Sequence, residues 1–185
     1  HMYIGHGIYL GVNARSGAWA RNNELPNQIK RIREFPEIQG SVYFSSKSFA
    51  ANPSGWSDSL RNNYYKYPAI PPPMPWIDDV IPPAPQIMLD EKKPVNADNT
   101  INLYLTQENP DAMINRYVIY DFNSEEGDMA DPKNIFQITV SGNDFYTIDL
   151  DRIPASQKKV YIAATSLTKT NNESRVSNKI VLERS

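Results

Sequence analysis

Hydrophobic and polar positions follow two different patterns along this chain of 185 residues. In the first part, short apolar runs at 3–9 and 40–45 predict two strands. Between them Leu25, Ile29 and Ile32 recur at helical spacing. A second, short helix is expected over about 57–65. The order strand, helix, strand, helix predicts a parallel βαβ unit with a right-handed crossover.

After residue 85 the pattern changes to strands alone. Apolar and polar residues alternate in several of these segments, and turn residues separate them. The seven candidates are 86–89, 100–105, 116–120, 135–140, 145–149, 160–164 and 179–182. About seven short strands in roughly 100 residues are typical of an immunoglobulin-like sandwich.

Proline separates the two patterns. Eight of the fifteen prolines fall within residues 68–85, where neither a helix nor a central strand can run through them. An extended connector is expected. It carries four large apolar residues, Trp76, Ile77, Val80 and Ile81, and we therefore expect it to pack against a flanking domain. The domains are expected at 1–67 and 86–185, with 68–85 as the linker.

The first part holds too few strands for a stable parallel sheet. Such sheets need cover on both faces and neighbouring strands on both edges. The segment is therefore incomplete unless something else completes it, or it is a small α+β domain with irregular cover. Exposed strand edges and apolar surface predict self-association through the N-terminal half, or folding of that half back onto the rest of the chain.

Composition narrows the classes of partner. The net charge is −2, and no basic stripe is present that could follow a phosphate backbone, so nucleic acid is not expected as a partner. No apolar run approaches the roughly 18 residues of a membrane helix. Cysteine is absent and only two histidines are present, so neither a metal site nor a cofactor is expected.

Four segments, taken together and in order, resemble the C-terminal end of a family of bacterial glycosyl-hydrolase-like proteins, the glycosyl-hydrolase-like 10 type. They are Tyr3-Ile4-Gly5-His6-Gly7-Ile8-Tyr9, Glu24-Leu25-Pro26-Asn27-Gln28-Ile29, Gly40-Ser41-Val42-Tyr43-Phe44-Ser45-Ser46-Lys47-Ser48 and Pro71-Pro72-Pro73-Met74-Pro75-Trp76-Ile77-Asp78. This resemblance implies a (β/α)₈ barrel that acts on carbohydrate. It also implies an extracytoplasmic location, because members of the family are usually exported or lipid-anchored.

The second part is similar to fibronectin type III domains in the segments Tyr161–Ala164, Asn172–Ser174 and Val176–Asn178. The expected fold class is thus α+β and multidomain. A partial barrel, consisting of the last two β/α units, precedes a seven-stranded antiparallel sandwich of the immunoglobulin or fibronectin III type.

Barrel active sites lie at the C-terminal ends of the strands. His6 would lie there and could bind a sugar hydroxyl or assist a carboxylate. The alternatives are a histidine in a loop or one bonded to the backbone. Ser45, Ser46 and Lys47 would end the last strand, where hydroxyl and ammonium groups can hold sugar oxygens. Their alternative role is that of a polar strand end.

Trp19 and Trp56 fall in the two loops that follow these strands. A flat ring can stack on a sugar, but such tryptophans more often pack under a loop.

Glycosidases normally need two carboxylates. Glu24 and Asp58 are better explained as helix-start residues, which favour the positive end of the helix dipole.

These observations predict a C-terminal fragment of a glycoside hydrolase whose catalytic carboxylates lie upstream. The fragment itself is expected to be inactive, with the sandwich as an accessory module. The alternative is a stand-alone carbohydrate-binding or protein-interaction module.

Overall fold

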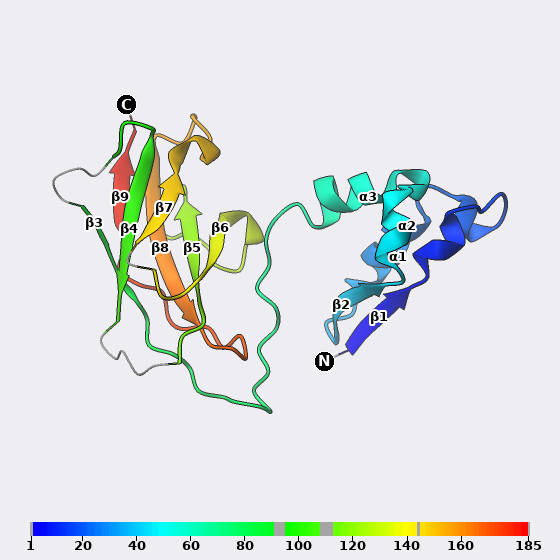
Figure 1. Ribbon diagram of the computed structural model, residues 1–185, viewed down its shortest axis with the longest axis horizontal. Helices are drawn as coiled ribbons and strands as arrows, with labels where there is room; N and C mark the ends of the chain where they lie inside the picture. Colours follow the sequence, from blue (N-terminus) through cyan, green and yellow to red (C-terminus); the bar gives the residue numbers. More distant parts are fainter. Residues whose placement is uncertain (1, 91–94, 108–112, 144, 185) are drawn as a thin grey trace. The chain divides into compact units, whose positions relative to one another are not determined.

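The computed structural model describes residues 2–90, 95–107, 113–143 and 145–184. The chain divides into two compact units, residues 1–66 and 67–185 (Figure 1). Each unit has a buried apolar core of its own. The described strands form three sheets, in the orders β1-β2, β3-β4-β7 and β6-β5-β8-β9.

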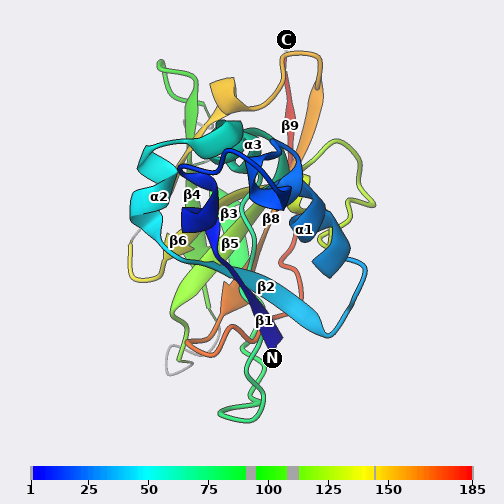
Figure 2. The same ribbon diagram turned by 90° about the vertical axis from the view of Figure 1, so that its right-hand side faces the viewer.

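The first unit is built on two parallel strands, β1 (Met2–His6) and β2 (Ile38–Tyr43), which lie side by side in Figure 2. The longest helix, α1 (Glu24–Ile32), connects them. The remaining helices are short: η1 (Ile8–Gly11), η2 (Ala18–Ala20), α2 (Ser46–Ala50), η3 (Pro53–Gly55), α3 (Trp56–Ser59) and η4 (Leu60–Tyr64).

Helix α1 is amphipathic, and its apolar stripe forms the centre of the first unit. Leu25 and Ile29, four residues apart, face the same way and are fully buried. They pack with Ile8 and Trp56. Lys30 lies on the opposite, exposed side of the helix. Burial of this stripe holds α1 against the rest of the unit.

The second unit consists of antiparallel strands. One sheet contains β3 (Gln86–Leu89), β4 (Thr100–Thr106) and β7 (Tyr146–Asp149). The other contains β6 (Ile135–Val140), β5 (Arg116–Phe122), β8 (Lys159–Leu167) and β9 (Ile180–Glu183). Two short 3-10 turns, η5 (Pro132–Asn134) and η6 (Leu150–Arg152), complete the described elements.

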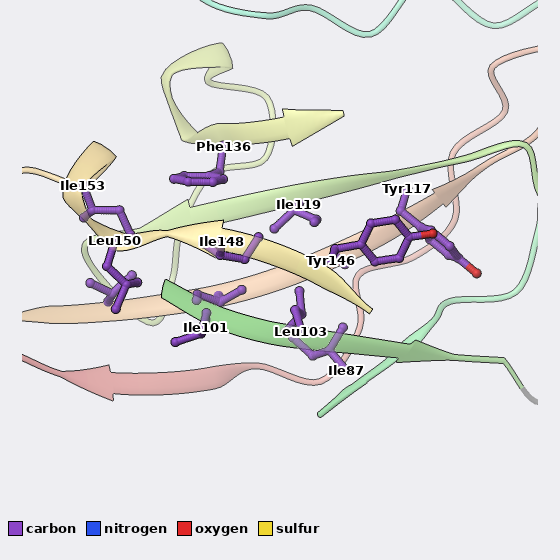
Figure 3. Close-up of a cluster of buried hydrophobic side chains, with 13 residues drawn as sticks. Ile87, Ile101, Leu103, Tyr117, Ile119, Phe136, Tyr146, Ile148, Leu150 and Ile153 are labelled. Carbon is purple, nitrogen blue, oxygen red and sulfur yellow. The ribbon is translucent and has the colours of Figure 1, made fainter. Parts of the chain in front are cut away.

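The main core of this unit draws side chains from both of its sheets (Figure 3). Ile101 and Ile148 come from the three-stranded sheet, and Ile119 and Ile162 come from the four-stranded sheet. All four are almost completely buried. Burial of each such side chain stabilises the fold by about 1.5–3 kcal/mol.

The expected fold class, a partial (β/α) barrel followed by a seven-stranded sandwich, is wrong. The described chain is β-rich, with few and short helices and three small sheets of two, three and four strands. Parallel pairing among the described residues is limited to one sheet of two strands, β1 and β2. The later strands divide into separate sheets of three and four. Alternating hydrophobicity predicts where strands lie, but their partners depend on contacts between residues far apart in the sequence.

The proline-rich segment is tied to the second unit at a turn that follows β8. The backbone N–H of Met74 donates to Thr170 O at 2.9 Å. The side-chain amide of Asn172 donates to Asp78 O at 2.7 Å and to Val80 O at 3.1 Å. Four large side chains of this segment nevertheless remain 63–69% exposed: Trp76, Ile77, Val80 and Ile81. We call residues 70–82 the strap.

Asn172→Ala should release the strap. The substitution removes the amide that donates to the carbonyl groups of Asp78 and Val80, and each such hydrogen bond contributes about 0.5–1.5 kcal/mol. We expect a lower free energy of unfolding in urea, together with faster amide exchange in the strap. Asn134→Ala, which removes an exposed amide bonded to Asp128 O, is the matched control. Equal effects of the two variants would contradict this role of Asn172.

Asp121 on β5 gives a pH-dependent contribution to stability. Burial raises the pKa of its carboxyl above the usual 3.8, while the nearby Arg152 acts in the opposite direction. The folded state therefore favours the protonated form. The favourable contribution is present below pH 3.8 and is lost as the pH rises through the folded pKa.

Asp121→Asn should thus increase stability modestly at neutral pH and have little effect at acid pH. Thermal unfolding measured across this pH range checks the prediction. A variant that is destabilised more at pH 7 than in acid would contradict it.

Candidate functional site

The C-terminal ends of β1 and β2 lie at the same edge of the first sheet, because the strands are parallel. His6, the last residue of β1, is aligned with Tyr43, the last residue of β2. Their rings stack, with centroids 5.1 Å apart. Phe44 and Ser45 follow directly, joined by a cis peptide bond. Most of the candidate residues from the sequence lie in or beside this edge.

His6 is 1% exposed, and both of its ring nitrogens have partners. Nδ1 lies 2.8 Å from Gln28 Oε1, and Nε2 lies 3.0 Å from Ser41 Oγ. Because an amide oxygen only accepts, Nδ1 donates to Gln28. Gln28 in turn donates to Glu24 Oε1 at 2.9 Å. His6 thus connects β1 with α1 and with β2 through side-chain hydrogen bonds. Binding of a sugar hydroxyl by its ring stays a prediction.

Ser45, Ser46 and Lys47 lie where β2 ends and α2 begins. Ser45 is half-buried at the N-terminus of α2, and its carbonyl oxygen accepts from the Ser48 N–H at 2.9 Å. Ser46 and Lys47 are exposed. A hydroxyl and an ammonium group therefore face solvent together at this edge of the sheet, which is an arrangement that can hold sugar oxygens.

The two tryptophans pack against each other. Trp56 is 1% exposed, its indole N–H donates to Asn22 O at 2.8 Å, and its ring meets that of Trp19 edge-on at 5.8 Å. A Cβ atom at Gly11 would lie 2.3 Å from the Trp56 ring, so only glycine allows this approach. Trp56 is therefore a core residue, and Trp19 is partly buried against it.

An aromatic cluster beside the site was not among the candidates from the sequence. Tyr43 and Tyr65 share a hydrogen bond of 2.7 Å between their hydroxyl groups. Burial raises the pKa of Tyr43, so its hydroxyl stays protonated at neutral pH. Tyr9 meets Phe44 edge-on at 5.7 Å. The alternation of side-chain directions along β2 could have identified Tyr43 as a residue of this site. Tyr43 lies two residues after Ser41, so its side chain points to the same face of the sheet.

The two carboxylates considered from the sequence have structural partners. Glu24 begins α1 and accepts from Gln28, while Asp58 in α3 accepts from the Asn52 amide at 2.8 Å. Within the described ranges, no group of three or more His, Cys, Asp or Glu side chains is placed to hold a metal ion. None of the helices described is long and apolar enough to span a membrane.

A cavity of about 450 Å³ lies between β1 and α1. Its lining is mainly apolar, and comes from Ile4 and Ile32 and from the apolar parts of Asn27, Gln28 and Arg31. His6 also lines it, although that ring is almost completely buried. The cavity therefore lies on the helix-covered side of the sheet, and Ser46 and Lys47 do not line it.

The tryptophan pair can be tested by paired truncation. Trp56→Ala should destabilise the first unit by about 3–5 kcal/mol, the usual cost of removing a buried aromatic side chain. Trp19→Ala should cost less, because Trp19 is only partly buried. Amide hydrogen exchange of β1, β2 and α1 in each variant gives the free energy of opening of the first unit. If the two costs were equal, the assignment of Trp56 as the core residue would be wrong.

The chain is similar to a known protein over almost its whole length. The chain is 28% identical over 181 residues to "Glycosyl hydrolase YngK" of Bacillus subtilis, which covers 96% of this chain and 33% of that protein. The chain thus spans about a third of the length of this curated relative. No protein-family model matches the chain, and nothing supports the expected fibronectin type III domain.

Among solved structures, the spore cortex lytic enzyme SleM of Clostridium perfringens is similar over part of the chain. The match has 17% sequence identity and a TM-score of 0.41, and it covers 58% of this chain and 30% of that one. A TM-score this low does not establish a shared fold.

Proposed function

We propose that this chain is part of a glycoside-hydrolase-related protein that acts on carbohydrate. The observation that carries the proposal is the similarity to glycosyl hydrolase YngK along 96% of the chain. Because the chain spans a third of that relative, the activity proposed for the whole protein need not be present in this part. An extracytoplasmic location, typical of the family that the sequence resembles, is part of the same proposal.

The chain itself is proposed to be inactive in hydrolysis. Glycoside hydrolysis normally needs one carboxyl group as acid and a second as nucleophile or base. Glu24 and Asp58, the two carboxylates weighed for this role, are engaged in hydrogen bonds within or beside short helices. The proposal places the catalytic pair in a part of a longer protein that this chain does not contain, and gives the second unit an accessory role.

Within this chain, the exposed edge at the end of β2 is the proposed contact with sugar. Ser46 and Lys47 offer a hydroxyl and an ammonium group to solvent, and the half-buried Ser45 lies next to them. Hydrogen bonds to a charged donor contribute about 1.5–3 kcal/mol each. His6, Trp19 and Trp56 would act indirectly, by holding the core of the same unit, because they are partly or fully buried.

We also infer that the chain self-associates through its first unit. Large apolar side chains are exposed on β2 and directly after it, among them Val42 and Phe44. Exposed patches of this kind mark interaction sites.

A second candidate function is a carbohydrate-binding module that acts as it stands. A polar cavity of about 430 Å³ in the second unit favours it. Amide, hydroxyl and ammonium groups line this cavity, from Asn123, Ser156, Gln157, Lys158 and Lys159. Such groups match the hydroxyl-rich surface of a saccharide.

Glycan binding and hydrolysis by the purified chain distinguish these functions. We expect no turnover of aryl glycosides above background. If the edge at β2 binds sugar, the double variant Ser46→Ala/Lys47→Ala should weaken binding on a glycan array at least about tenfold, which corresponds to about 1.4 kcal/mol. Lys30→Ala, an exposed lysine on α1 of the same unit, is the matched control.

Binding lost only on changing Lys158 and Lys159 would favour the second candidate. Turnover that depends on Glu24 or Asp58 would contradict the proposal that the chain is inactive.

A further inference from the structure

The two sheets of the second unit differ in their outer faces. On the four-stranded sheet, Val118, Tyr120 and Phe122 are buried in a second apolar cluster, on the side of β5 that points away from the main core. Ile70 of the strap and Val176 pack against this cluster. This outer face is therefore apolar and is covered by other parts of the same unit.

The outer face of the three-stranded sheet is open. Along β4, Ile101 and Leu103 are buried in the main core, so Asn102 and Tyr104 point to the opposite side of the sheet. Met88 on β3 is aligned with Tyr104 and is 51% exposed. This sheet therefore presents the alternate side chains of its strands to solvent.

Three apolar side chains cross this face in one row. Met88 and Tyr104 are aligned in neighbouring strands, and the Phe145 ring lies 5.8 Å from the Tyr104 ring. Phe145 directly precedes β7, which is paired with the other edge of β4, and it is 42% exposed. Neighbouring strands are about 4.8 Å apart, so the row is about 10 Å long. We call these three residues the apolar row.

Polar side chains flank the apolar row on both sides. Asn102 and Thr147 are aligned on one side, and the Thr147 hydroxyl donates to Asn102 Oδ1 at 3.4 Å. Gln86 and Thr106 are aligned on the other side. All four side chains are uncharged, and their amide and hydroxyl groups both donate and accept hydrogen bonds. We call the apolar row and its polar flanks the platform.

We propose that the platform binds a neutral saccharide chain. This inference rests on the proposed action on carbohydrate, and it gives the accessory role of the second unit a site. A saccharide ring has an apolar C–H face and a rim of hydroxyl groups. The C–H face packs against the apolar row, and the hydroxyl groups bond to the polar flanks. Small-ligand sites commonly combine apolar and aromatic side chains with a few polar groups in this way.

The size of the apolar row favours a saccharide over a protein partner. A fully covered aromatic side chain buries about 150–250 Å². Met88 and Phe145 are about half exposed and Tyr104 is half-buried, so the row offers roughly 200 Å² on that scale. A stable protein contact takes about 800 Å² from each partner. The row is too small for such a contact, but a narrow saccharide chain can cover it.

The polar flanks explain why this face stays open. Burying an amide or hydroxyl group without a partner costs about 1–3 kcal/mol. An apolar surface from any other part of a longer protein is therefore a poor occupant of the platform. A saccharide differs in this respect, because its own hydroxyl groups replace the hydrogen bonds that the flanks make with water.

Charge favours a neutral chain over an acidic one. The second unit carries eleven Lys and Arg against seventeen Asp and Glu, a net charge of −6 over residues 67–185. None of the seven platform residues is charged, and Asp149 follows Thr147 on the same face of β7. An acidic saccharide gains no ion pair on the platform and is repelled by the surrounding charge. Binding of a neutral chain should therefore change little with salt concentration.

The test uses two phenylalanines of nearly equal exposure. Phe145→Ala shortens the apolar row, whereas Phe35→Ala makes the same change at a 41% exposed position of the first unit. Binding by the whole chain is measured on an array of neutral and acidic glycans and in native gels that contain soluble β-glucan, mannan or polygalacturonate. Phe145→Ala should raise the dissociation constant for the neutral glycans at least about tenfold, or about 1.4 kcal/mol. Phe35→Ala should leave it unchanged.

A second measurement keeps the result independent of folding. The chain has no cysteine, so Thr147→Cys gives a single thiol for maleimide labelling beside the apolar row. Its labelling should slow as the concentration of the bound glycan rises. Val140→Cys places the same thiol at a 67% exposed position of the other sheet, and its labelling should not change. Circular dichroism confirms that each variant is folded.

Each outcome decides a separate statement. Binding of a neutral glycan that Phe145→Ala weakens and Ser46→Ala/Lys47→Ala does not weaken supports the platform. Binding that is lost only on changing Ser46 and Lys47, or only on changing Lys158 and Lys159, overturns the platform and leaves the proposed action on carbohydrate standing. A preference for polygalacturonate that falls with salt overturns the neutral ligand.

Absence of binding to every neutral glycan also overturns the platform. The proposed action on carbohydrate is decided separately, by hydrolysis with a longer protein that contains this chain. Failure of the platform and failure of that proposal are therefore distinguishable.

Discussion

Parallel pairing of β1 with β2 is the constraint on which the first unit depends. Two parallel strands require a crossover, and here that crossover is α1. The crossover covers one face of the sheet and leaves the other bare. It also brings His6 and Tyr43, which are far apart in the sequence, into contact at one edge. The candidate sugar contact at the end of β2 is thus a result of this pairing.

The second unit depends on satisfied polar groups as much as on its apolar core. The segment from Thr165 to Ser177 contains many buried polar side chains. Thr165 is one of them, and its hydroxyl donates to Glu173 Oε1 at 2.6 Å. The Tyr120 hydroxyl donates to the same oxygen at 2.6 Å. Burial and this hydrogen bond raise the pKa of Tyr120, which keeps its hydroxyl a donor. The same segment anchors the strap through Asn172, so core packing and strap position are connected.

Local patterns in the sequence predicted the elements well and their assembly poorly. The expected helix containing Leu25 and Ile29 is α1, and the strand expected at 116–120 lies within β5. These elements follow from residues a few positions apart. The pairing of β4 with β7, across more than forty residues, left no comparable local signal. This is why the expected barrel fragment and seven-stranded sandwich were wrong.

The candidate site shows the same limit. The candidate residues differ in exposure: Ser46 and Lys47 are exposed to solvent, whereas Trp56 and His6 are buried. Nothing in the sequence near His6 indicates that Gln28 and Ser41 take both of its ring nitrogens, because those partners come from other elements. The polar strand end could be predicted from the sequence, but the neighbours of each side chain could not.

The distribution of tryptophan gives the two units separate optical signals. Trp19 and Trp56 lie in the first unit, with Trp56 in its core, and Trp76 lies in the strap with 63% of its surface exposed. The apolar core of the second unit is rich in isoleucine and tyrosine and contains no tryptophan among the described residues. Indole emission that shifts to longer wavelength therefore reports exposure of Trp56, while the emission of the solvent-facing Trp76 changes little. Melting of the sheets in the second unit is followed by far-ultraviolet dichroism, so one sample can show whether the units lose structure together or in sequence.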